Sequence, residues 1–263
     1  MSLQLALIQM DIAYGDPEAN KNKVIQKIGE AASHKPDIIV LPELWNTGYD
    51  LARLDEIADP DGSETKKLMQ NLAKKYQVHI VAGSIANKTD SGFYNTLYAF
   101  DKQGVQVGEY SKAHRFRLMD EDQYLQAGHH MGLFTLENLP CAGVICYDIR
   151  FPEWTRKAAL NGAELLFVPA EWPKPRLDHW RQLLLTRAIE NQWFVIACNR
   201  AGSDPNNVFA GHSIVIDPWG EVIAEAGTEE TILYATIDPE QVAEVRSRIP
   251  IFSDRRPELY AEI

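Results

Sequence analysis

Polar side chains with reactive chemistry lie at the ends of several short apolar runs. Glu43, Cys146 and Cys198 each come directly after or at the end of such a run, and Lys112 follows a further predicted strand. Ligands of open α/β sheets gather at the carboxyl ends of strands, so these positions are candidates for a site. A thiol becomes a good nucleophile when a base or a cation assists the loss of its proton. The pattern is therefore typical of a thiol enzyme.

Each of these residues also has a plainer interpretation. A free cysteine after an apolar run is more often a core residue than a nucleophile, and Cys198 competes with Cys146 for the role. Glu43 alone could be a solvated carboxylate, and Lys112 alone a surface charge. Five histidines could provide the base of a Cys/His pair, and spacing selects none of them: His114, His129, His130, His179 and His212. The sequence has neither the ligand spacing of a zinc site nor a glycine-rich phosphate loop.

Strand-like and helix-like segments, which must position these side chains, alternate along the chain. Short β-branched runs predict buried strands at residues 3–9, 38–41, 78–85, 96–100, 142–146, 165–168, 194–198, 213–216 and 232–237. Polar and apolar residues at helical spacing predict helices at residues 20–32, 65–76, 153–161, 178–191 and 239–248. This alternation predicts an α/β fold. Turn residues at 101–104 and 217–220 predict hairpins, and hairpins in such a fold imply mixed sheets.

The composition is that of an ordinary folded protein: the chain has 263 residues, 45% hydrophobic and 24% charged. No linker-like or low-complexity stretch marks a boundary, so residues 1–263 are expected to form a single domain. A net charge of -11, without a Lys/Arg block, argues against nucleic acid and anionic membranes as partners. With no export leader, no apolar run of about 20 residues and an odd number of cysteines, we expect a cytoplasmic protein with free thiols.

Three longer motifs narrow the interpretation. They are LPEL at residues 41–44, YSKAH at 110–114 and GVICYDIRFPE at 143–153. In this order they resemble the three signature blocks of the nitrilase superfamily of carbon-nitrogen hydrolases. Further matches are ALIQ at 6–9, RAIEN at 187–191, GHS at 211–213, DPWG at 217–220 and DRRPELY at 254–260. The resemblance therefore covers essentially the whole chain.

The resemblance implies a mechanism of amide hydrolysis. By similarity, Cys146 is the nucleophile, and Glu43 takes the thiol proton and later protonates the departing ammonia. Lys112 and the backbone N–H of Tyr147 would stabilise the oxyanion. Glu121 matches a further family glutamate that positions the lysine or assists proton transfer, and an ordinary loop charge is its alternative. The resemblance implies neither a metal nor a cofactor.

Residues near the nucleophile separate branches of the family. CYD at 146–148 is similar to the amidase side, whereas nitrile-cleaving enzymes typically carry Trp-Glu after the cysteine. The stretch 169–173, followed by His179 and Trp180, resembles bacterial omega-amidases, which release ammonia from the distal amide of dicarboxylic monoamides such as 2-oxoglutaramate. The alternatives are an N-carbamoyl amino-acid amidohydrolase, a catalytically silent member that binds a small molecule, and a Cys/His peptidase that uses Cys198.

An omega-amidase substrate carries a distal carboxylate, which requires a cation or several N–H donors in its pocket. Arg115, Arg176 and Arg200 are candidates that the sequence does not rank. The predicted substrate-binding residues are Tyr147, Trp172 and Arg176, and a core position is the alternative for Trp172.

The resemblance also implies an architecture. The family fold is a four-layer α-β-β-α sandwich, in which two mixed sheets pack face to face with helices outside. Members usually associate through these helices, so we expect a homodimer or larger homo-oligomer. The tail 249–263 has little helical or strand periodicity and is expected to lie at a subunit interface.

Overall fold

Two mixed β-sheets form the centre of the computed structural model, which describes residues 2–260. In spatial order, the first sheet contains β13 (Thr231–Ile237), β1 (Leu3–Gln9), β2 (Ile38–Val40), β4 (His79–Thr89), β5 (Gly92–Phe100) and β6 (Gln106–Ser111), with β3 (Asp59–Pro60) paired to β4. The second contains β12 (Val222–Glu225), β11 (Ile214–Ile216), β10 (Phe194–Asn199), β9 (Leu165–Ala170), β8 (Leu139–Gly143) and β7 (Gly132–Leu136). In both sheets the three central strands are parallel, and the outer pairs are antiparallel except for the short β3, which pairs in parallel with β4.

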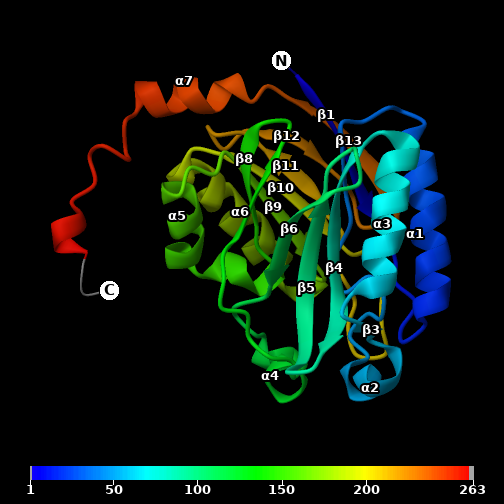
Figure 1. Ribbon diagram of the computed structural model, residues 1–263. Helices are drawn as coiled ribbons and strands as arrows, with labels where there is room; N and C mark the ends of the chain where they lie inside the picture. Colours follow the sequence, from blue (N-terminus) through cyan, green and yellow to red (C-terminus); the bar gives the residue numbers. More distant parts are fainter. Residues whose placement is uncertain (1, 261–263) are drawn as a thin grey trace.

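Helices cover the outer face of each sheet. The longer ones are α1 (Pro17–Ala32), α3 (Ser63–Tyr76), α5 (Pro152–Leu160), α6 (Leu177–Asn191) and α7 (Glu240–Arg248). The short ones are η1 (Leu51–Arg53), α2 (Leu54–Ile57), η2 (Arg117–Met119), α4 (Glu121–Tyr124), η3 (Cys146–Arg150), η4 (Lys174–Arg176) and η5 (Pro257–Leu259). Figure 1 shows α1 and α3 on one side of the molecule and α5 and α6 on the other.

The strand pattern explains this layered arrangement. Successive side chains of a strand point to opposite faces, and β1 is apolar on both. Leu5 and Leu7 enter the core between the two sheets, where they join residues of the second sheet such as Phe167. Ala6 and Ile8 enter the core under α1 and α3. The result is a four-layer α-β-β-α sandwich, which confirms the expected fold class.

The expected strands and helices are present, with bounds shifted by a few residues. Both predicted hairpins join antiparallel strands, β5 to β6 and β11 to β12. Short strands such as β7 and β12 were not predicted, because their apolar runs are brief.

One predicted boundary is wrong in a way that matters for the site. The strand expected to reach Cys146 ends at Gly143, where its parallel pairing with β9 ends. Cys146 instead begins the turn η3, with a positive φ of 45°.

After α7 the chain continues in turns and η5 up to Tyr260, and residues 261–263 of the expected tail lie outside the described part. None of the helices between residues 2 and 260 has both the length and the apolar composition of a membrane span.

Candidate active site

Both sheets contribute to a buried polar cluster at their shared edge. Glu43 follows β2 and Lys112 follows β6 of the first sheet, whereas Cys146 follows β8 of the second. Glu121 is the first residue of α4. All four side chains are buried, with at most 5% of each residue exposed. Residues that are far apart in the sequence are therefore brought together in the interior.

A close approach between two backbones places Glu43. Gly83 has a φ of 58°, and a Cβ at this position would lie 2.0 Å from the carbonyl oxygen of Pro42. The register of β4 is irregular at this point, and Ser84 binds the turn through its backbone and its hydroxyl. Its N–H donates to the Pro42 carbonyl at 3.1 Å, and its hydroxyl accepts from the N–H of Leu44 at 3.0 Å. Only glycine at position 83 allows the backbone to approach Pro42 this closely without strain.

Two donors converge on one oxygen of Glu43. Oε1 accepts hydrogen bonds from Lys112 Nζ at 2.8 Å and from Asn95 Nδ2 at 2.7 Å. The Tyr49 hydroxyl lies 3.1 Å from the same oxygen, but its single O–H is directed at the closer Glu121. Oε2 of Glu43 accepts one hydrogen bond, from the backbone N–H of Glu171 at 2.8 Å. Because a carboxylate oxygen offers about two lone-pair sites, Oε1 is saturated and Oε2 retains acceptor capacity.

Glu121 holds the lysine from the other side. Its Oε1 accepts from Lys112 Nζ at 2.6 Å and from the Tyr49 hydroxyl at 2.6 Å, and its Oε2 accepts from the backbone N–H of Phe116 at 2.7 Å. An ammonium has three N–H donors. With two of them directed at Glu121 and Glu43, Lys112 keeps one for another acceptor.

Asp148 connects the cysteine turn to the lysine loop. Its Oδ2 accepts from the backbone N–H of Ile145 at 2.9 Å and from the Tyr110 hydroxyl at 2.8 Å. Its Oδ1 lies 3.0 Å from the backbone nitrogen of His114 and 2.7 Å from the Nδ1 of the same residue. These contacts fix the two segments that carry Cys146 and Lys112.

Burial and nearby charges set the protonation of the cluster. Burial alone would lower the pKa of Lys112, but the attraction of Glu121 and Glu43 raises it well above its ordinary value. Burial raises the pKa of Glu121, against the effect of Lys112. Burial and the charge of Glu43 raise the pKa of the Cys146 thiol, whereas Lys112 lowers it. Lys112 therefore stays a cation, and the thiol needs an acceptor for its proton.

A narrow pocket opens beside the thiol. It is lined by Phe116, Cys146, Tyr147, Arg150, Glu171, Trp172, Pro173 and Arg176. Its volume of about 10 Å³ is close to that of one water, so side chains at its mouth must move to admit a substrate.

Two arginines of this pocket face aromatic rings. The guanidinium of Arg150 lies 4.8 Å from the ring centre of Trp172, and that of Arg176 lies 5.4 Å from the ring centre of Phe116. Within residues 2–260, neither forms an ion pair with a carboxylate.

The structure places the residues expected from the sequence as follows. Tyr147, Trp172 and Arg176 line the pocket with Cys146, while Glu43, Lys112 and Glu121 form the cluster behind it. Of the other two arginine candidates, Arg115 donates to the backbone carbonyl of Leu125, and Arg200 is fully buried against Glu171. Neither lines this pocket.

Sequence reasoning missed Tyr49, Asn95 and Glu171, and did not place Arg150 in the substrate pocket. Asn95 is a polar residue inside a buried strand, and Glu171 directly follows β9, the same signal that drew attention to Glu43. No group of side chains suited to a metal ion occurs in the described chain.

Known proteins share this sequence and fold. The model of the carbon-nitrogen hydrolase family matches residues 4–247. The chain is 55% identical over 260 residues to the 2-oxoglutaramate amidase of Bacillus subtilis, covering 99% of this chain and 100% of that protein. It is 34% identical to human omega-amidase NIT2, covering 99% and 97%. A CN-hydrolase superfamily protein of Xanthomonas campestris, whose crystal structure has an arsenic adduct in the active site, superposes with a TM-score of 0.91 at 29% identity, covering 97% and 98%.

Proposed function

Because this chain belongs to the carbon-nitrogen hydrolase family, we propose that it hydrolyses the terminal amide of a short dicarboxylic monoamide such as 2-oxoglutaramate, with release of ammonia. The observation that carries the proposal is the convergence of one thiol, one carboxylate and one ammonium beside a pocket that also contains two arginines without acidic partners. The names of the Bacillus subtilis and human relatives support the same substrate class.

The first half of the reaction forms a thioester. Oε2 of Glu43 takes the Cys146 proton, because both lone-pair sites of Oε1 already accept from Lys112 and Asn95. The sulfur attacks the amide carbon, and the free N–H of Lys112 and the backbone N–H of Tyr147 donate to the oxyanion. Glu43 then returns the proton to the amide nitrogen. The carbon-nitrogen bond breaks and ammonia leaves.

The second half of the reaction releases the acid. A water loses its proton to Glu43 as its oxygen attacks the thioester carbon, and the same two donors again meet the oxyanion. The carbon-sulfur bond breaks and Cys146 regains its proton. Glu121 keeps Lys112 in place during both halves, because its bond to Nζ is the shortest that the ammonium makes in the cluster.

The arginines favour a substrate with a distal carboxylate. Arg150 and Arg176 border the pocket and lie against aromatic rings, contacts that a carboxylate can replace with stronger charge-assisted hydrogen bonds. A neutral aliphatic amide would leave both cations without an acidic partner. We therefore assign the distal carboxylate of the substrate to this end of the pocket.

A side-by-side assay tests the proposal. Ammonia release would be measured with 2-oxoglutaramate, succinamate, an N-carbamoyl amino acid and an aliphatic nitrile, and intact-protein mass spectrometry would follow acylation of the wild type and of Cys146→Ala. We expect the two monoamides to be hydrolysed and an acyl adduct to form only when Cys146 is present. Activity on carbamoyl compounds alone would overturn the proposal.

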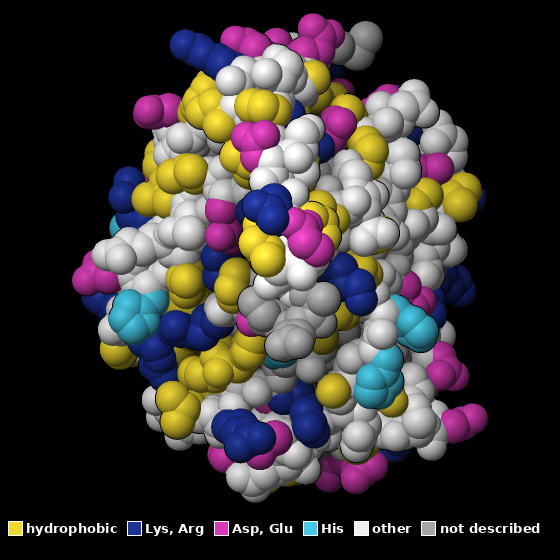
Figure 2. Space-filling model, turned by 90° about the vertical axis from the view of Figure 1, so that its left-hand side faces the viewer, with side chains coloured by type: hydrophobic (Ala, Val, Ile, Leu, Met, Phe, Trp, Pro, Cys, Tyr) yellow, Lys and Arg dark blue, Asp and Glu magenta, His cyan; other side chains and the backbone are white. Residues whose placement is uncertain are grey.

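We also propose that the protein is a cytoplasmic homodimer or larger homo-oligomer and that its tail contributes to the interface. Large apolar side chains are exposed on α5, α6 and the tail, among them Leu160, Ile189 and Leu259. Figure 2 shows hydrophobic side chains gathered on the face that carries this part of the chain. The three cysteines are free thiols, as suits a reducing compartment. Sizing chromatography of a chain ending at Arg248 would test the assembly, and an unchanged oligomer would exclude a role of the tail.

A further inference from the structure

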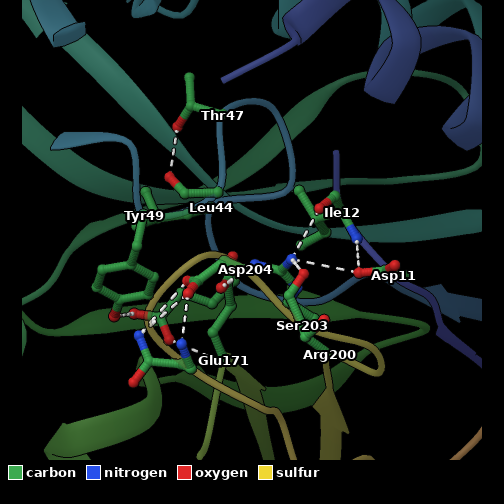
Figure 3. Close-up of polar contacts among 12 residues, drawn as sticks. Asp11, Ile12, Leu44, Thr47, Tyr49, Glu171, Arg200, Ser203 and Asp204 are labelled. Atoms are coloured by element: carbon green, nitrogen blue, oxygen red, sulfur yellow. Dashed lines mark hydrogen bonds and ion pairs between the residues drawn. The ribbon is translucent and has the colours of Figure 1, made fainter. Parts of the chain in front are cut away.

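A second buried ion pair lies behind the general base. Glu171 directly follows β9 and Arg200 directly follows β10, and Oε2 of Glu171 accepts from Arg200 Nη1 at 2.7 Å. Both residues have no exposed surface. Figure 3 shows Glu171 between Tyr49 on one side and Arg200 with Asp11 on the other. The pair thus connects the polar cluster to loops outside it.

Arg200 is held rigidly by several partners. Its Nη2 has two N–H donors for three nearby acceptors, the Ile12 carbonyl at 2.7 Å, the Ser203 carbonyl at 3.1 Å and Asp11 Oδ1 at 3.2 Å, so one N–H is shared. The guanidinium lies 4.2 Å from the ring centre of Phe209. Because the arginine has so many fixed contacts, it can serve as an anchor for Glu171.

Burial of Glu171 and Arg200 costs desolvation free energy. Burial of two charged groups is repaid only when their remaining hydrogen-bonding atoms are satisfied, and such a pair is weak evidence of stabilisation. Here Oε1 of Glu171 is buried without a hydrogen-bond partner in the described chain. Burial raises the pKa of Glu171 to about 8, although Arg200 lowers it. What the pair does provide is a fixed backbone position directly beside Glu43.

We infer that Glu171, anchored by Arg200, is a positioning residue that sets the orientation of Oε2 of Glu43. This inference rests on the proposed function, in which Oε2 takes the thiol proton. The backbone N–H of Glu171 donates to this oxygen at 2.8 Å, and the bond from the side chain of Glu171 to Arg200 holds that N–H in place. Catalysis therefore requires a side chain at position 171 that is long enough to bind Arg200, and it does not require a negative charge there.

Two substitutions separate reach from charge. Glu171→Asp keeps the carboxyl group but shortens the side chain, so the bond to Arg200 forms only if the backbone N–H moves away from Glu43. Glu171→Gln keeps the length and an acceptor for Arg200 but removes the ionisable carboxyl group. We expect Glu171→Asp to lower kcat about 100-fold, the scale of an ångström of misplacement, and Glu171→Gln to stay within a fewfold of wild type. Neither should change KM more than a fewfold.

Alkylation of Cys146 by iodoacetamide gives a readout that does not depend on turnover. Misplacement of Glu43 should slow alkylation per folded active site in Glu171→Asp and shift its pH dependence, while Glu171→Gln follows the wild type. Asp11→Asn, which alters an exposed partner of Arg200, is the matched control and should remain within twofold. Thermal unfolding and active-site titration would correct each rate for the folded fraction.

The outcomes are distinct. Loss of activity in Glu171→Gln with retention in Glu171→Asp would show that charge is what matters and would overturn the inference. So would a rise in KM without a change in kcat, which would place Glu171 in contact with substrate, or corrected rates that are equal in all variants. If the wild type hydrolyses no amide, the proposed function fails, while the alkylation series still tests the positioning of Glu43.

Discussion

Cys146 follows β8 and Cys198 lies in β10, two strands of the second sheet that have β9 between them. Both thiols are buried, yet their surroundings differ. Cys198 lies inside β10, and its sulfur is 3.3 Å from the carbonyl oxygen of Ile8 and 3.5 Å from that of Val40, both in the opposite sheet. Cys146 lies beyond the end of β8, on a turn with positive φ. Burial raises the pKa of both thiols, but only that of Cys146 is opposed by a cation, Lys112.

The difference shows what makes a cysteine chemically useful in this fold. A residue within a strand points into a closed layer, where backbone carbonyls and apolar side chains satisfy it. A residue past the strand end is released from the sheet and can meet polar groups from other strands. The turn at Cys146 achieves this, and the bonds of Asp148 to Ile145 and His114 hold it in place.

Replacement of each cysteine by alanine tests the two assignments most directly. Cys146→Ala should lower kcat by about 10⁴-fold or more, because no other group in the cluster can form the thioester. Cys198→Ala should retain activity within a fewfold and lose about 1 to 3 kcal/mol of unfolding free energy, through lost packing between the sheets. Ammonia release and chemical denaturation measure the two effects. If Cys198→Ala lost activity and Cys146→Ala kept it, Cys198 would be the nucleophile and Cys146 the core residue.

The cation beside Cys146 is the next difference to test. Lys112→Met removes the one ammonium that the described chain directs at Glu43 and Glu121, and with it a donor to the oxyanion. The loss of one such donor typically costs about 100-fold to 1000-fold in kcat. Because Lys112 lowers the pKa of Cys146, its removal should also move the alkylation profile of the thiol to higher pH. An unchanged profile would contradict the role of the lysine at the sulfur.

The sequence predicted the elements and the central residues of the polar cluster, but not the turn that carries Cys146. The alternation of apolar runs identified most strands and helices, and the motifs around Glu43, Lys112 and Cys146 named the central residues of the cluster. The position of Cys146 on a turn was not predictable from its apolar run, because the end of β8 depends on where its pairing with β9 stops. Local patterns carry no information on such pairings.

The supporting residues were harder still to find. Tyr49 and Asn95 meet Glu43 only after β2 and β5 have taken their places in one sheet, with β4 between them. From the sequence, Arg200 was a candidate to bind the distal carboxylate of the substrate, whereas in the structure it is fully buried against Glu171. Partners separated by many residues in the chain are fixed by the topology, which composition and spacing do not determine.

A pocket that can bind a charged substrate is a further feature of the surroundings of Cys146, and removal of Arg176 from its lining tests this. Arg176→Ala should raise KM for 2-oxoglutaramate about 10-fold to 100-fold, the range expected for one charge-assisted hydrogen bond. The kcat should change little, because Arg176 does not contact the reacting atoms. Hydrolysis of a neutral amide of the same length is the control and should be unaffected. An equal loss on both substrates would remove the distal carboxylate from this end of the pocket.

A further difference between the two regions concerns the dependence of stability on pH, which should arise beside Cys146 and not beside Cys198. Burial raises the pKa of Glu171 from 4.5 to about 8, so between these values the folded protein binds one proton that the unfolded chain has lost. Raising the pH through this window therefore favours unfolding, by at most about 1.4 kcal/mol per pH unit. Glu171→Gln should flatten the curve measured by urea denaturation from pH 5 to 9, whereas Cys198→Ala should lower it by the same amount at every pH. Parallel curves for wild type and Glu171→Gln would mean that Glu171 is ionised throughout, and that Arg200 balances the cost of its burial.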